Sequence, residues 1–280
     1  MHKKASSIVI LTIIYIIAAA AGCLAFNQLD GILHEYWALF WADVVATIIV
    51  WAFGLFYKNV SVYDPYWSVF PPVAFTAWAF HKATFSSPVI LLLVAVWYWG
   101  IRLTGNWAYT FNGIKHEDWR YTRYRETQSP LFFHIINLFG LNMMPTIVVF
   151  AAMLPGLGLF ESHASARVLT WVGFAMCLLS ATIQLVADTQ IHRFRNNHPG
   201  QYCNIGLWRH GRHPNYFGEI MMWWGVWVMY ASLYGFDWLI LGPIAITMLF
   251  LCVSIPMMER RQLQNKPGYA EYKKHTRRLI

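Results

Sequence analysis

The chain concentrates its chemically reactive side chains between residues 188 and 219, where a basic stretch runs into an apolar segment. Arg212-His213-Pro214-Asn215 leads into that segment, and a proline suits the first turn of a helix, where backbone N–H groups stay free to meet an anion. Arginines beside such a helix end favour two-pronged contacts with phosphate or carboxylate. We therefore predict an anion-binding site at this helix start. Its ionisable side chains are Asp188, His192, Arg193, Arg195, His198, Arg209, His210 and Arg212.

Asn215 and Glu219 make this prediction more specific. They are one helical turn apart, so they share a helix face that points into the membrane if the segment spans it. A basic loop that binds lipid headgroups would explain the arginines. It would not explain a buried Asn–Glu pair directly after Arg212-His213-Pro214. A ligand site accounts for both features, and the headgroup-binding loop is the alternative.

Other polar side chains lie inside or beside apolar runs, where an ionisable group is costly unless it faces a cavity or a partner. Asp64 precedes Pro65, so capping a helix start is its simplest role. Arg102, with Asn106 one turn later, fits either a ligand site or a side chain that reaches for the membrane interface. Asp43 lies in mid-span, where it has either a structural partner or a functional role.

A second basic segment follows the last apolar run and includes Arg260 and Arg261. Together with the first basic stretch, it predicts a composite site for an anionic ligand. The sequence carries no phosphate-binding loop, no dinucleotide-binding glycine fingerprint after a strand and no zinc-protease motif. The four cysteines lack the spacing of metal ligands. We predict no metal site, and a bound dinucleotide would need a site of another kind.

Membrane helices must position these side chains, because 58% of the 280 residues are hydrophobic and only 12% are charged. A soluble domain carries roughly 25% charged residues. We predict an all-α, polytopic membrane helical bundle with eight spans, or seven if the short 66–80 run with Pro71-Pro72 does not cross. The predicted runs are 7–26, 36–57, 66–80, 88–111, 133–155, 167–187, 216–234 and 238–256.

The positive charges orient this bundle, because Lys and Arg accumulate on the cytoplasmic side of a membrane protein. With both termini in the cytoplasm, 18 of the 21 Lys and Arg residues fall on that side. The net charge of +8 is therefore explained by topology, and we predict no nucleic-acid partner. The predicted cytoplasmic segments are 1–6, 58–65, 112–132, 188–215 and 257–280.

The stretch from Gly206 to Glu219, with Trp223-Trp224-Gly225 after it, resembles the steroid 5-alpha-reductase superfamily and, within it, the bacterial and plant branch called DUF1295. Glu117-Asp118-Trp119-Arg120-Tyr121 and the segment from Pro256 to Arg261 look like the same branch. The likeness covers roughly residues 60–280, which follow the N-terminal helices in 1–57. The first of these helices looks like an addition to the seven-span pattern of the steroid reductases. We predict a single integral membrane domain over 1–280, in a bacterial inner membrane or, in a eukaryote, the endoplasmic reticulum.

The resemblance implies an NADPH-dependent reductase of a conjugated carbon–carbon double bond in an apolar enone. It implies an acid and a tyrosine that polarise the enone carbonyl, here Asp64 and Tyr98, although the tyrosine position also aligns with Trp99. The substrate would be a steroid, sterol or isoprenoid that enters from the bilayer, while NADPH binds the cytoplasmic loops 112–132, 188–215 and 257–280 of a monomer. The implied cofactor-binding residues are Asp188, Arg195, Tyr202, Arg212, His213, Asn215, Tyr216, Glu219, Arg260 and Arg261.

Two other functions stay open. Arg212-His213-Pro214 with the basic, glutamate-containing tail also resembles the isoprenylcysteine carboxyl methyltransferases, which use S-adenosylmethionine. The Asn215–Glu219 spacing favours the reductases over these enzymes. The other function is a non-catalytic sterol- or lipid-binding membrane protein that kept the scaffold without turnover.

Overall fold

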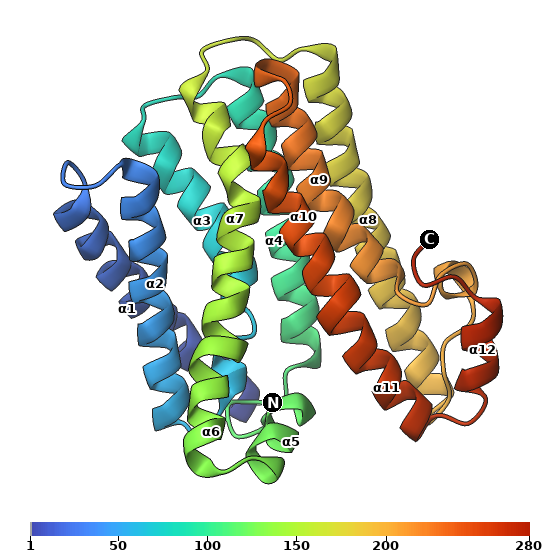
Figure 1. Ribbon diagram of the computed structural model, residues 1–280. Helices are drawn as coiled ribbons and strands as arrows, with labels where there is room; N and C mark the ends of the chain where they lie inside the picture. Colours follow the sequence, from blue (N-terminus) through green and yellow to red (C-terminus); the bar gives the residue numbers. More distant parts are fainter. Residues whose placement is uncertain (1) are drawn as a thin grey trace. The chain divides into compact units, whose positions relative to one another are not determined.

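The computed structural model describes residues 2–280, and the regular elements of that range are all helices, which confirms the all-α prediction (Figure 1). All eight apolar runs predicted to span the membrane lie in helices, apart from one end residue in each of the runs 36–57, 88–111 and 167–187. The α-helices are α1 His2–Leu29, α2 Glu35–Phe56, α3 Tyr66–His81, α4 Ser87–Thr110, α5 Trp119–Thr127, α6 Pro130–Ile135, α7 Met144–Gly158, α8 Val168–Asn197, α9 Pro214–Tyr234, α10 Leu241–Met248, α11 Ile255–Asn265 and α12 Tyr269–His275.

Six helical segments in the described residues are long and apolar enough to cross a membrane, as expected of a multi-pass membrane protein. Two of them are composite: α6 continues through a π-helical stretch (Ile136–Met143) into α7, and α10 continues through another (Leu249–Ser254) into α11. The two remaining predicted spans are α3, which has 16 residues and contains Pro71 and Pro72, and α9, which has 21 residues. The predicted count of eight stays a prediction. The six segments are Lys4–Leu29, Glu35–Phe56, Ser87–Thr110, Pro130–Glu161, Val168–Asn197 and Trp238–Asn265.

All three segments predicted as cytoplasmic cofactor-binding loops are partly helical, and 112–132 contains α5 and the start of α6. The 188–215 segment continues α8 as far as Asn197, and its helix ends where His198 precedes Pro199, because a residue before proline is disfavoured in the helical conformation. The 257–280 segment contains most of α11 and all of α12. These helices are separated at Lys266-Pro267-Gly268, where Gly268 adopts a φ of 77°. Asp188 therefore lies within α8, and the helix fixes the position of its backbone.

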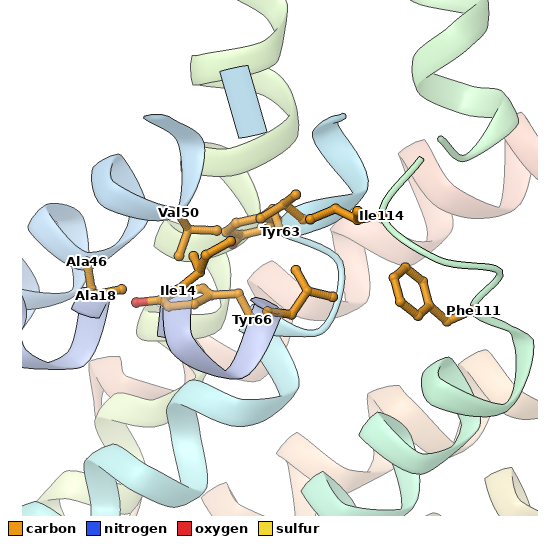
Figure 2. Close-up of a cluster of buried hydrophobic side chains, with 10 residues drawn as sticks. Ile14, Ala18, Ala46, Val50, Tyr63, Tyr66, Phe111 and Ile114 are labelled. Atoms are coloured by element: carbon orange, nitrogen blue, oxygen red, sulfur yellow. The ribbon is translucent and has the colours of Figure 1, made fainter. Parts of the chain in front are cut away.

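The helices form two compact units, and the prediction of one integral domain stays a prediction. The first unit contains residues 2–70 and 103–150. Its helices α1 and α2 pack together around Ile14, Val50, Tyr63 and Tyr66 (Figure 2). Tyr15 ties α1 to the loop after α2 by donating a hydrogen bond to the carbonyl of Val62 at 2.8 Å. This arrangement gives the short loop before α3 a fixed place.

The second unit contains residues 71–102 and 151–280, and the packing of α8 against α9 dominates it. Small residues let the two backbones approach closely. A Cβ added to Gly173 would lie 2.7 Å from the carbonyl oxygen of Gly225, and one added to Gly218 would lie 2.7 Å from that of Ser180. This antiparallel register places the C-terminal end of α8, which carries Asp188, opposite the start of α9.

Candidate functional site

A buried polar cluster joins three helices of the second unit. Arg102 on α4 lies 3.1 Å, Nη1 to Oδ2, from Asp188 on α8 and 3.9 Å, Nη2 to Oε2, from Glu219 on α9. Arg102 also donates a hydrogen bond to the side-chain oxygen of Gln184, one turn before Asp188. Asn215 donates to Asp188 at 3.4 Å. We call these five residues the Arg102 cluster.

Helix periodicity assembles the Arg102 cluster. Gln184 and Asp188 are four residues apart on α8, and Asn215 and Glu219 are four residues apart on α9, so each pair lies on one helix face. Pro214 occupies the first turn of α9, as predicted, and His213 precedes it as the N-cap. The contacts with Asp188 and Arg102 show that Asn215 and Glu219 share the face expected from their spacing.

Two tryptophans complete the surroundings of Glu219. The indole N–H of Trp99 lies 2.9 Å from one carboxylate oxygen of Glu219 and 3.1 Å from the other. The indole N–H of Trp223, one turn along α9, lies 3.1 Å from Oε1 of Glu219. The indole N–H of Trp99 lies at the same distance from this oxygen. Both tryptophan side chains are fully buried, and their rings meet edge-on at 5.3 Å. Glu219 is thus held by neutral donors from two helices.

The Arg102 cluster retains unused hydrogen-bonding capacity. Arg102 Nε and Gln184 Nε2 are buried, and neither finds a partner among the residues that the structure describes. A buried donor without a partner costs about 1 to 3 kcal/mol, so such atoms indicate an acceptor from outside the chain. The donor set therefore fits a polar, acceptor-rich ligand such as a nucleotide cofactor.

Three other residues predicted to bind a cofactor lie around this cluster or beside the tail. Arg195 is exposed near the end of α8, and its charge interacts with that of Asp188. Tyr216 stacks on His213, with ring centroids 5.4 Å apart. Tyr202 stacks instead on Tyr272 of α12, at 5.0 Å. Arg195 is therefore associated with Asp188, whereas Tyr202 is held by the C-terminal segment.

Arg212 and His213 bind the chain's own acceptors. Arg212 Nε donates to Glu259 at 2.7 Å, and its Nη1 donates to the backbone carbonyls of Lys273, at 2.9 Å, and Thr276. Glu259 also accepts from Lys273 at 2.7 Å and lies 3.3 Å from His213 Nε2. Burial lowers the pKa of His213, while its hydrogen bond to Glu259 opposes that shift.

These contacts attach the C-terminal segment to the start of α9. The backbone N–H of Arg212 also donates to the carbonyl of Arg277 at 2.9 Å. The other two predicted residues of the tail, Arg260 and Arg261, follow Glu259 on α11; Arg260 is exposed and Arg261 is half-buried. The structure therefore brings Arg212 and His213 together with Glu259, a residue that the sequence did not single out.

In the first unit, Asp64 has a tyrosine partner that the sequence did not predict. The hydroxyl of Tyr121 donates to the Asp64 carboxylate, and Arg120 Nη2 lies 3.9 Å from the same oxygen. Burial raises the pKa of Asp64 to about 6, although the Arg120 cation acts to lower it. Tyr98 belongs to the second unit, where its hydroxyl lies 3.1 Å from that of Thr182.

Loop contacts hold Asp64 in place. Asn59 donates to the carbonyl of Ile114 at 2.6 Å, and Glu117 accepts from the backbone N–H of Val60 at 2.9 Å. The hydroxyl of Ser61 accepts from the backbone N–H of Asp118 at 2.9 Å. The loop before α3 and the loop before α5 are therefore interlocked, and this brings Tyr121 to Asp64.

The sequence offered different signals for the residues that it missed. Gln184 is a polar side chain in an apolar run and one turn from Asp188, which could have placed it in the cluster. The resemblance had drawn attention to Trp99 and Trp223, but nothing in the sequence of a chain with 15 tryptophans indicated that both contact Glu219. Among the described residues, no three His, Cys, Asp or Glu side chains gather as they would around a metal ion.

Comparisons with known proteins identify a family. The family model described as "Protein of unknown function (DUF1295)" matches residues 50–276. An uncharacterized protein of Schizosaccharomyces pombe is 24% identical over 210 residues, which amount to 62% of this chain and 58% of that protein. The chain thus spans less than two thirds of the length of this relative. No solved structure matches the chain.

Proposed function

Because the chain belongs to the DUF1295 family, we propose that it is a membrane-embedded reductase that uses NADPH to reduce a conjugated carbon–carbon double bond in an apolar enone. The observation that carries this proposal is the Arg102 cluster, a buried group of charged and amide side chains with two donors that have no partner among the described residues. Such a cluster is costly inside a membrane protein unless a ligand or a partner uses it.

In this proposal, NADPH supplies a hydride when it is bound, and the chain binds and orients it. Asp188, Asn215 and Glu219 would hold its polar groups, together with the unused donors of Arg102 and Gln184. Arg195, at the end of α8, is suited to a phosphate because its guanidinium offers two parallel N–H donors. The basic segments at this end are predicted to lie in the cytoplasm, where NADPH is available.

Asp64 is the proposed proton donor. Reduction of an enone builds negative charge on the carbonyl oxygen, and a carboxylic acid near that oxygen stabilises the charge and can release a proton. With a pKa of about 6, Asp64 keeps a fraction of its carboxyl protonated near neutral pH. Tyr121, whose hydroxyl donates to one Asp64 oxygen, orients this carboxyl, and Tyr98 stays the proposed tyrosine that polarises the enone carbonyl. The proton on the other oxygen is then available to the substrate.

Thermal stabilisation of the purified protein in detergent tests this function. NADPH should raise the midpoint of unfolding, and S-adenosylmethionine should leave it unchanged. Stabilisation by S-adenosylmethionine alone would support the methyltransferase instead, and a response to a sterol with neither cofactor would support a lipid-binding protein.

Variants should localise the NADPH response to the Arg102 cluster. Asn215→Ala should weaken it, because the side-chain contact with Asp188 is lost. Asn27→Ala is the matched control, since Asn27 is exposed on α1 and lies outside the three predicted cofactor-binding loops. Equal NADPH affinity in these two variants would show that the cofactor binds elsewhere.

A further inference from the structure

The carboxylate of Glu219 is surrounded by hydrogen-bond donors. Its Oε1 receives the indole N–H groups of Trp99 and Trp223, and its Oε2 receives Trp99 at 2.9 Å and faces Arg102 at 3.9 Å. A protonated carboxyl would need an acceptor for its O–H, whereas a carboxylate accepts at both oxygens. The contacts of the described residues therefore suit the ionised form of Glu219.

The donors nearest to Glu219 stabilise its negative charge without cancelling it. Indole N–H groups are neutral, so the formal charge of the carboxylate remains. The one cation near Glu219 in the Arg102 cluster is Arg102, which lies closer to Asp188, at 3.1 Å against 3.9 Å. Arg195 also interacts with Asp188, but from an exposed position where water weakens the interaction. The Arg102 cluster thus contains two anions, Asp188 and Glu219, and one cation, Arg102, so its net charge is negative.

We infer that Glu219 is a fixed anion that makes the Arg102 cluster select a positively charged ligand over its neutral counterpart. This inference rests on the proposed function, in which the ligand is a nicotinamide cofactor whose oxidised ring carries a positive charge and whose reduced ring is neutral. In a buried environment of low dielectric constant, one unit charge on the ligand has a large effect on its affinity. The cluster should therefore bind NADP⁺ more tightly, relative to NADPH, than it would without the Glu219 charge.

The test compares the affinities of NADP⁺ and NADPH for the full-length protein in detergent, measured by titration calorimetry. Glu219→Gln keeps the shape and an acceptor oxygen for the indoles but removes the charge. It should lower the ratio of NADP⁺ to NADPH affinity by about tenfold, which corresponds to roughly 1.4 kcal/mol. An unchanged ratio would overturn the inference. Glu161→Gln, at an exposed glutamate outside the three predicted cofactor-binding loops, is the control and should leave the ratio as it is.

A second variant keeps the test decisive if Glu219→Gln does not fold. Trp99→Phe removes the indole donor that touches both carboxylate oxygens, so Glu219 can turn towards Arg102 and lose its excess charge. The affinity ratio should again fall, by about threefold or more. Trp227→Phe is the matched control, because the indole N–H of Trp227 is buried without a partner among the described residues. A fall of equal size in the control would contradict the inference.

The failure of this inference can be told apart from the failure of the proposed function. If both nucleotides bind and their affinity ratio does not respond to Glu219→Gln, the reductase function stands and the inference fails. If neither nucleotide binds the wild-type protein, the proposed function fails. The same ratio is then measured for S-adenosylmethionine and S-adenosylhomocysteine, which differ by one positive charge. A ratio that falls in Glu219→Gln would support the inference, and an unchanged ratio or no binding would overturn it.

Discussion

Glu219 and Glu259 are two buried glutamates of the same unit with opposite surroundings. Their side chains are equally hidden, each with 4% exposed. Glu259 lies among cations: Arg212 and Lys273 both approach to 2.7 Å, and His213 lies at 3.3 Å. Glu219 receives its close contacts from the neutral indoles of two tryptophans.

The difference separates a structural carboxylate from one suited to bind a ligand. The charge of Glu259 is neutralised within the chain, and its partners attach the C-terminal segment to the start of α9. The nearest donors to Glu219 are neutral and Arg102 lies at 3.9 Å, so we infer that the charge of Glu219 stays available to a bound group. Burial alone does not distinguish these two roles, whereas the charge of the nearest donors does. Changes to each carboxylate should therefore have different consequences.

The largest expected effect belongs to Glu259→Gln. Removing this anion leaves the buried guanidinium of Arg212 without its charge partner, and breaking a buried pair in this way costs about 3 to 5 kcal/mol. Chemical unfolding in detergent should show the loss, together with faster proteolysis after Arg212 as the tail detaches. Glu271→Gln, at an exposed position, should unfold as the wild type does. Equal stability of the two variants would remove the structural role assigned to Glu259.

Asp64 extends the comparison to a carboxyl whose charge is only partly compensated. Its pKa is about 6 in the folded protein against an ordinary value of 3.8, so the folded state binds the proton more tightly than the unfolded chain does. The tighter proton binding stabilises the folded state. This contribution to the free energy of unfolding is fully present below about pH 4 and is lost as the pH rises through about 6. It amounts to roughly 3 kcal/mol.

Asp64→Asn should therefore flatten the fall in unfolding free energy between about pH 4 and pH 7, because asparagine does not titrate. Thermal unfolding at a series of pH values measures this slope. Glu126→Gln provides the control in the same unit, since Glu126 is exposed. A slope in Asp64→Asn as steep as in the wild type would show that Asp64 does not titrate in this range.

Glu219→Gln should cost little stability, in contrast to the same change at position 259. Glutamine keeps an acceptor oxygen for the indoles, and Arg102 keeps its closer partner Asp188 at 3.1 Å. We expect a loss of about 1 kcal/mol, the size of one weakened hydrogen bond. Unfolding in denaturant measures it. A loss as large as that of Glu259→Gln would mean that Glu219 is a structural residue too.

The smallest effect is expected at the outer partner of Glu259. Lys273 has 39% of its side chain exposed, so water already screens its pairing with Glu259. Lys273→Met should lower the free energy of unfolding by about 0.5 kcal/mol. High salt should reduce the difference between this variant and the wild type further. A loss of several kcal/mol would place Lys273, rather than Arg212, as the main partner of Glu259.

Features that depend on residues near one another in the sequence were predictable. The apolar runs identified the helices because about 20 apolar residues are needed to cross a membrane. Pro214 marked the start of α9, and the four-residue spacing of Asn215 and Glu219 placed them on one face. Helix ends were less predictable, because α8 and α11 continue beyond their apolar residues into charged turns.

Only the tertiary structure decided which partners these side chains have. By sequence, Arg102 fits a ligand site and the membrane interface equally well, and the approach of α8 and α9 placed it between Asp188 and Glu219. The partner of Asp64 lies 57 residues away, and the interlocked loops brought Tyr121 to it. The Gly206-to-Glu219 stretch by itself marked where a ligand site begins. Which of its charges are neutralised within the chain, and which stay available, depends on contacts between distant residues that no local pattern encodes.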